Sequence, residues 1–100
     1  MVDNGVVAVL SDAQVDAGLA GLTDWSRAGD AIETTYELAS FPDAVAFVTR
    51  VAFLAEAANH HPDLDIRWRR VRVVLSTHDE GGITDKDLAL AEAIEALGAR

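Results

Sequence analysis

Apolar side chains recur at helical spacing between Phe41 and Asn59, and this stretch limits the possible folds more than any other. Pro42 and Asp43 suit the first turn of a helix, and Pro62 follows its expected end. The apolar stripe consists of Ala44, Val45, Phe47, Val48, Val51, Ala52, Leu54 and Ala55. A stripe of this breadth predicts a long central helix that is the best-buried element of the chain.

Residues on both sides of this helix alternate with the period of a β-strand. From Ile32 to Leu38 the even-numbered residues are apolar or β-branched, and two of the three odd-numbered residues between them are glutamates. Arg70 to Thr77 repeats the alternation with valine and leucine at its first odd positions. Two weaker segments precede these strands, one from Trp25 to a turn at Ala28–Asp30 and one over Asp65–Arg69. The sequence therefore predicts two strands before the helix and two after it.

Two further helices are expected near the ends of the chain. Ser11 or Asp12 resembles an N-cap for a short helix over Asp12–Ala20, after a loose lead-in at residues 1–9. Thr84 is a strong N-cap for a last helix over Asp85–Leu97. The order helix, two strands, long helix, two strands, helix predicts a two-layer α+β domain, with antiparallel strands and the helices on one face.

Length and charge restrict the class of protein. The 100 residues fit a single domain over 1–100, with no linker or internal repeat. A net charge of −9 argues against direct binding to nucleic acid, because such a surface repels phosphates. The absence of cysteine excludes disulfides and thiolate chemistry. With no secretion signal and no apolar run near the roughly 18 residues that span a bilayer, we expect a soluble cytoplasmic protein without membrane contact.

All three histidines lie in two short stretches, Glu56–Pro62 and Ser76–His78. Imidazoles exchange protons near neutral pH, so three that converge would form a proton-transfer site. Glu56 lies four residues before His60 and could orient an imidazole. Taken alone, the adjacent histidines could equally be solvated residues at a helix end. A zinc site is a weaker alternative, because adjacent histidines seldom reach one ion and no cysteine supports them.

The linked spacing Glu56-x-x-x-His60-His61-Pro62, then Trp68, His78 and Asp87, resembles the signature of pterin-4a-carbinolamine dehydratases. The similarity extends from about residue 10 to residue 97 and includes Gly82-Ile83-Thr84 before Asp87. The resemblance implies an antiparallel four-stranded sheet with helices on one side, and association into homodimers or homotetramers. It implies dehydration of 4a-hydroxytetrahydropterin to quinonoid dihydropterin, which recycles the cofactor of aromatic amino-acid hydroxylases. No metal, nucleotide or other cofactor is implied; the pterin is the substrate.

The resemblance also implies roles for individual residues. His60 and His78 would transfer protons, His61 would mainly hold the pterin, and Glu56 would orient a histidine and stabilise its charged form. The expected catalytic residues are His60, His61, His78 and Glu56. The expected substrate-binding residues are Trp25 as a pocket wall, Ser76 and Thr77 chiefly through backbone groups, and Asp87, which also has the position of a helix-capping residue.

Two features leave alternatives open. Many family members carry Asp where this chain has Asn59, and the change removes a possible charge partner for the histidines. The basic cluster Arg67–Arg72 is either a solvated edge or a contact for a partner or substrate. The rival function is a non-enzymatic module on the same fold, for dimerisation, assembly or transcriptional coactivation. A dehydratase for another pterin, such as one in the molybdenum-cofactor pathway, is a further possibility.

Overall fold

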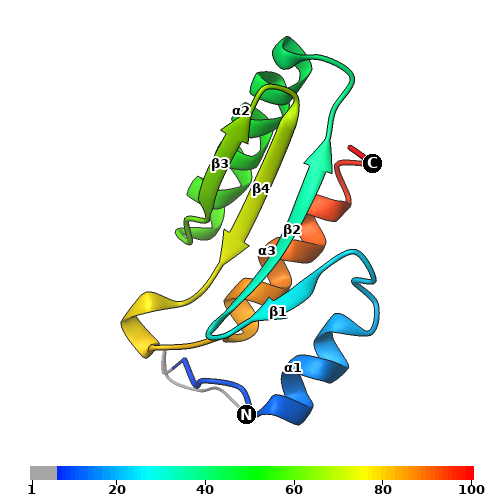
Figure 1. Ribbon diagram of the computed structural model, residues 1–100. Helices are drawn as coiled ribbons and strands as arrows, with labels where there is room; N and C mark the ends of the chain where they lie inside the picture. The colour runs from blue at the N-terminus through cyan, green and yellow to red at the C-terminus, as the bar shows by residue number, and fades with distance from the viewer. Residues whose placement is uncertain (1–6) are drawn as a thin grey trace.

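The computed structural model describes residues 7–100, which form three α-helices and four β-strands (Figure 1). In chain order these are α1 (Asp12–Leu19), β1 (Ser26–Ala28), β2 (Ala31–Glu37), α2 (Phe41–Ala58), β3 (Asp63–Arg67), β4 (Arg70–Leu75) and α3 (Asp85–Glu95). A short 3₁₀ turn, His78–Glu80, follows β4. Of the lead-in expected at residues 1–9, only residues 7–9 are described, and they form no helix or strand.

The four strands form one antiparallel sheet in the order β1-β2-β4-β3. On one face Ile32, Thr34 and Tyr36 of β2 pair with Leu75, Val73 and Val71 of β4, and all six are buried. The three helices cover this face, and Figure 1 shows α2 and α3 lying behind the sheet. The predicted two-layer α+β fold, with a four-stranded antiparallel sheet and helices on one face, is confirmed.

The opposite face of the sheet is polar, as the alternation in β2 and β4 predicts. Arg72 is opposite Thr35 in the register and forms an ion pair with Glu33. Arg70 lies 3.3 Å from Glu37, which also pairs with Arg69. The basic cluster of the sequence is therefore joined to acidic side chains of this sheet.

Helix α2 begins and ends at residues suited to those positions. Ser40 is the N-cap and accepts a hydrogen bond from the backbone N–H of Asp43. At the other end Asn59 adopts the left-handed conformation, with φ of 48°, which few residues other than glycine and asparagine tolerate. This residue ends the helix and redirects the chain toward β3.

Strand pairing brings the two histidine-bearing stretches together. Asp63, the first residue of β3, is opposite Val74 near the end of β4. The residues just before β3 and just after β4 must therefore be neighbours, although the chain turns between them at Trp68 and Arg69. Within residues 7–100, no helix has the length and apolar character needed to cross a membrane.

Candidate active site

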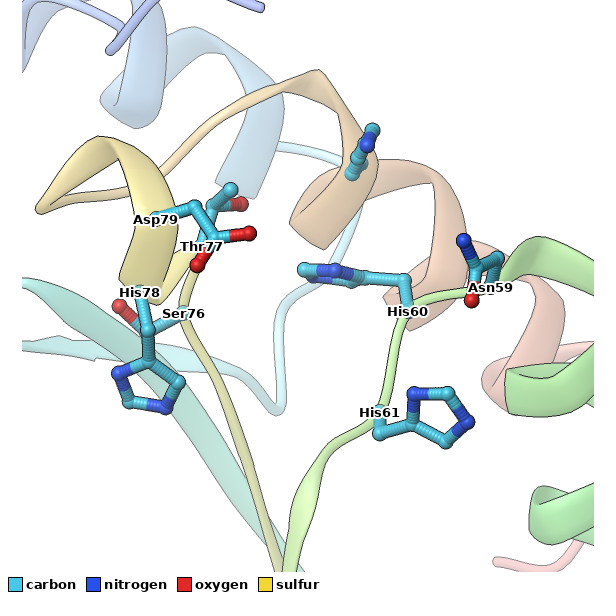
Figure 2. A pocket seen from close by; sticks show the side chains of 8 residues that line it. Asn59, His60, His61, Ser76, Thr77, His78 and Asp79 are labelled. Carbon is cyan, nitrogen blue, oxygen red and sulfur yellow. The ribbon is translucent and has the colours of Figure 1, made fainter.

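The two histidine-bearing stretches line a single pocket of about 380 Å³, within the range of small-molecule sites. Figure 2 shows His60 and His61 on one segment and His78 on the segment that faces it. The lining residues are Asn59, His60, His61, Ser76, Thr77, His78, Asp79 and Lys86. We refer to this space as the histidine pocket.

His60 is held by a buried carboxylate. Its Nε2 lies 2.5 Å from Oδ1 of Asp87, which is fully buried, and His60 itself is only 9% exposed. Because an ionised carboxylate can only accept, it favours the tautomer with the proton on Nε2. In neutral His60, Nδ1 is then the nitrogen with a free lone pair. The geometry thus prepares one imidazole of the pocket to accept a proton at a defined atom.

Asp87 is fixed in turn by the start of α3. Its Oδ2 accepts hydrogen bonds from the backbone N–H of Thr84 at 2.9 Å and from the Thr77 hydroxyl at 2.8 Å. Thr84 is the N-cap, and with Asp87 it forms a capping box. The sequence left Asp87 ambiguous between helix cap and site residue; one oxygen caps the helix while the other holds His60.

His61 is paired with the carboxylate that precedes it. Its Nε2 lies 2.8 Å from Oε1 of Glu56, and both side chains are largely exposed. In Figure 2 the His61 ring points away from His78. Glu56 therefore orients His61, while His60 takes Asp87 as its partner. The left-handed turn at Asn59 explains this, because it removes His60 from the helix turn above Glu56.

His78 lies across the pocket on a tight turn. The turn is closed by a hydrogen bond from the Thr77 N–H to the Gly82 carbonyl and by Gly81 in the left-handed conformation. His78 is exposed and begins this turn. The two residues before it have occupied hydroxyls: Ser76 donates to the Asp30 carbonyl, and Thr77 donates to Asp87. The Thr77 carbonyl also accepts hydrogen bonds within the turn, from the N–H groups of Glu80 and Gly81, so Ser76 rather than Thr77 has backbone groups to offer a ligand.

The structure does not bring Trp25 to the histidine pocket. Its ring is buried in the core, where Nε1 donates to Glu95 Oε1 at 2.9 Å. Trp68 of the sequence signature is 70% exposed at the β3–β4 turn and does not line the pocket either. The sequence analysis did not identify Lys86 and Asp79, which also line the pocket. Lys86 could have been found, because it is the only lysine of the chain and directly precedes Asp87.

The zinc alternative finds no support in the part of the chain that is described. Residues 7–100 contain no group of three or more histidine, cysteine or acidic side chains arranged to hold a metal ion. His60 and His61 instead pair with separate carboxylates, Asp87 and Glu56. The arrangement is suited to holding and moving protons.

Comparison with known proteins identifies relatives over nearly the whole chain. A family described as "Pterin 4 alpha carbinolamine dehydratase" matches residues 8–97. A protein of Roseiflexus castenholzii is 55% identical over 92 residues, which cover 92% of this chain and 99% of the relative. One from Chloroflexus aurantiacus is 58% identical over 88 residues, 88% of this chain and 95% of the relative. Both carry the provisional name pterin-4-alpha-carbinolamine dehydratase.

Two solved structures share the fold. A transcriptional coactivator/pterin dehydratase from Brucella melitensis superposes with a TM-score of 0.87 at 30% identity, covering 92% of this chain and 99% of that one. A pterin dehydratase-like protein, described as a RuBisCO assembly factor in the alpha-carboxysome, gives a TM-score of 0.59 at 20% identity. The second match covers 73% of this chain and 84% of the other, and it shows the fold alone.

Proposed function

The chain belongs to the pterin-4a-carbinolamine dehydratase family, and from this premise we propose that it dehydrates a 4a-hydroxytetrahydropterin to the quinonoid dihydropterin. The observation that carries the proposal is the buried His60–Asp87 pair in a pocket that His78 also lines. In the family's setting, this reaction would return the pterin cofactor of aromatic amino-acid hydroxylases to its cycle.

The reaction requires two proton movements. The bond between C4a and its hydroxyl breaks, the departing oxygen takes up a proton and leaves as water, and N5 loses its proton as the C4a=N5 double bond forms. Oxidation state is unchanged, so acid–base groups suffice and we propose no metal or nucleotide cofactor. Each well-placed acid or base accelerates such a step by about 10²–10⁴-fold.

His60 is the proposed base and His78 the proposed acid. Asp87 holds the Nε2 proton of His60, which leaves Nδ1 to accept the proton from N5. The Asp87 carboxylate then stabilises the imidazolium that forms. His78 is exposed and exchanges protons with solvent, which suits a group that protonates the departing hydroxyl and is recharged from water.

The remaining polar residues of the pocket would hold the ring. The pyrimidine edge of a pterin alternates hydrogen-bond donors and acceptors, and the Asn59 carboxamide offers one of each. His61, fixed by Glu56, would contact the ring from the same segment. Ser76 would contribute to substrate binding through its backbone groups, whereas Thr77 contributes indirectly, because its hydroxyl holds Asp87.

Decay of freshly generated 4a-hydroxytetrahydropterin, followed by absorbance, tests the proposal. Wild type should accelerate the decay, and His60→Ala and His78→Ala should each lose about 10²-fold or more in kcat. Asp16→Ala, at an exposed position of α1 outside the pocket, is the control and should retain full activity. Decay that is equally slow with wild type, both histidine variants and no protein would reject the enzyme.

A second candidate function is assembly, and a specific surface favours it. Phe41, Val45 and Phe53 are 51%, 43% and 75% exposed. They are separated by four and eight residues along α2, which places them along one side of the helix. Such a stripe is typical of a contact between proteins. We propose that it joins copies of this chain into a homodimer or homotetramer. An oligomer without dehydratase activity would identify the chain as an assembly module instead.

A further inference from the structure

Two features of the chain take no part in the proposed reaction: the basic cluster Arg67–Arg72 and, within it, the exposed ring of Trp68. They lie where β3 ends and β4 begins, whereas the histidine pocket lies where β3 begins and β4 ends. On the polar face of the sheet, a hollow of about 320 Å³ is lined by Thr35, Asp65, Arg67, Arg70 and Arg72. We refer to it as the arginine hollow. It shares no lining residue with the histidine pocket.

The charges around the arginine hollow are out of balance. The four arginines of the cluster pair with only three carboxylates, because Arg69 and Arg70 share Glu37. Arg67 and Arg70 are also directly opposite each other in the register of β3 and β4. Like charges at opposed positions destabilise a sheet. An anion between these two guanidinium groups would remove the repulsion.

The ion pairs of the cluster orient the guanidinium groups and leave donors for a ligand. The pair of Arg70 uses Nε, and that of Arg72 uses one terminal nitrogen. A guanidinium has five N–H donors in a planar fork, which matches the oxygens of a carboxylate or phosphate. The Arg70 and Arg72 side chains are 67% and 47% exposed, and ion pairs at the surface contribute little stability. A multiply charged anion can therefore compete for these donors.

Trp68 adjoins the arginine hollow. A second hollow, of about 310 Å³, is lined by Glu37, Trp68, Arg69 and Arg70, so Arg70 lines both spaces. The Trp68 side chain is 70% exposed, and an indole exposed to this extent offers a flat surface on which an aromatic ring stacks. Its backbone is held in the left-handed region, with φ of 56°. Strained positions of this kind cluster at ligand sites.

We propose that the arginine hollow and Trp68 form a second ligand site, and that its ligand is a nucleoside diphosphate. A diphosphate has enough anionic oxygens to pair with more than one guanidinium, whereas a carboxylate pairs with one. The phosphates would lie among Arg67, Arg70 and Arg72, and the base would stack on Trp68. Stacking tolerates any base, so we expect little preference among them.

The overall acidity of the chain does not prevent this binding. The net charge is −9, but half of the eight basic residues lie in the six positions from Arg67 to Arg72. Exposed charges more than about 8 Å apart are largely screened at physiological ionic strength, so the local arginines determine the attraction. The proposal is independent of the dehydratase reaction, because it uses no residue of the histidine pocket.

Calorimetric titration of the intact protein tests the site. Wild type should bind ADP and GDP with similar micromolar Kd, and pyrophosphate about 10-fold more weakly, because pyrophosphate has no base to stack. Arg70→Ala should weaken ADP binding by about 10-fold or more. Trp68→Ala should weaken ADP binding to the level of pyrophosphate and leave pyrophosphate binding unchanged, which also shows that this variant is folded. Arg50→Ala is the matched control, because it removes an exposed arginine of α2 outside both hollows.

The outcomes decide the proposal without reference to turnover. Losses in Arg70→Ala and Trp68→Ala, with Arg50→Ala binding as wild type does, support the site. It is overturned if wild type binds no ADP, or if Arg70→Ala and Arg50→Ala bind ADP equally well. Equal affinity of wild type for pyrophosphate and ADP would also overturn it, because the base would then make no contact.

Discussion

At the scale of single residues, the two oxygens of Asp87 connect the start of α3 to the proposed base. Oδ2 caps the helix and Oδ1 holds His60, so this carboxylate is a positioning residue that acts through the imidazole. Asp87→Asn keeps the shape of the side chain but replaces the carboxylate with an amide. Only a hydrogen-bond acceptor at this place stabilises the His60 tautomer with the proton on Nε2. We expect kcat to fall about 10²-fold or more, with KM little changed.

Kinetics across pH distinguish positioning from a general loss of structure. The pH–rate profile of Asp87→Asn should change form, whereas a merely loosened fold would scale it evenly. Glu56→Gln is the matched control, because its pair with His61 is exposed and should contribute less. Circular dichroism checks that both variants are folded. Equal losses in Asp87→Asn and Glu56→Gln would contradict the assignment of His60 as the base.

The sequence pattern predicted which side chains gather in the pocket, but it did not predict which of them form pairs. The spacing placed His60, His61 and His78 as candidates, and all three line it. The Glu56–His61 pair could not be read from a four-residue spacing, because it depends on the left-handed backbone of Asn59. Trp25 was expected as a pocket wall, and its place in the core could not be foreseen, because its partner Glu95 lies 70 positions away in the chain.

At the scale of elements, the periodic placement of apolar residues predicted the strands and the long helix. Each of these elements has one face in the core and one in solvent, and this difference leaves a period in the sequence. The turn between β3 and β4 carried no such signal. There Trp68 has φ of 56°, a conformation that L side chains other than asparagine and aspartate rarely adopt. Tryptophan favours strands, yet Trp68 occupies a turn position where glycine is usual. Nothing in the local sequence therefore indicates a two-residue turn.

This turn should therefore be open to stabilisation. Trp68→Gly relieves the left-handed strain and should raise the free energy of unfolding by about 1 kcal/mol, a rise in Tm of about 4–8 °C. Trp68→Ala is the control, because it removes the same exposed ring and its contact with Arg69 but keeps a side chain at this φ. Thermal unfolding of all three proteins compares them, and an Ala variant as stable as the Gly variant would assign the effect to the ring.

At the scale of the whole molecule, Glu95 of α3 connects the helical layer to the sheet. It accepts hydrogen bonds from Trp25, from Tyr36 of β2 and from Arg100, whose guanidinium also lies over the Tyr36 ring. Burial acts to raise the pKa of Glu95, but the hydrogen bonds from Arg100, Tyr36 and Trp25 outweigh it and hold the pKa below its ordinary value of 4.5. Burial, with the Glu95 contact, raises the pKa of Tyr36.

The lowered pKa of Glu95 predicts how stability depends on pH. A carboxyl group with a lower pKa folded than unfolded stabilises the fold above its unfolded pKa, and the contribution is lost as pH falls through the folded value. Urea unfolding between pH 7 and pH 3 should show wild type losing stability more steeply below about pH 4.5 than Glu95→Gln, which has no proton to bind there. Parallel curves for the two proteins would show that this cluster is not coupled to folding.

The exposed stripe on α2 carries the last prediction, which concerns assembly. The stripe repeats every four residues and consists of Phe41, Val45, Thr49 and Phe53. The Thr49 hydroxyl donates a hydrogen bond to the Val45 carbonyl, so the polar group within the stripe already has a partner. Placing a charge at Phe53, the most exposed of the three apolar residues, should cost an oligomer far more than a monomer, because the charge would be buried only on association. We expect Phe53→Asp to sediment as a monomer of about 10.7 kDa at concentrations where wild type forms dimers or tetramers. Ala17→Asp on α1 should sediment as wild type does, and a wild type that is already monomeric throughout the micromolar range would show that this surface does not join copies of the chain.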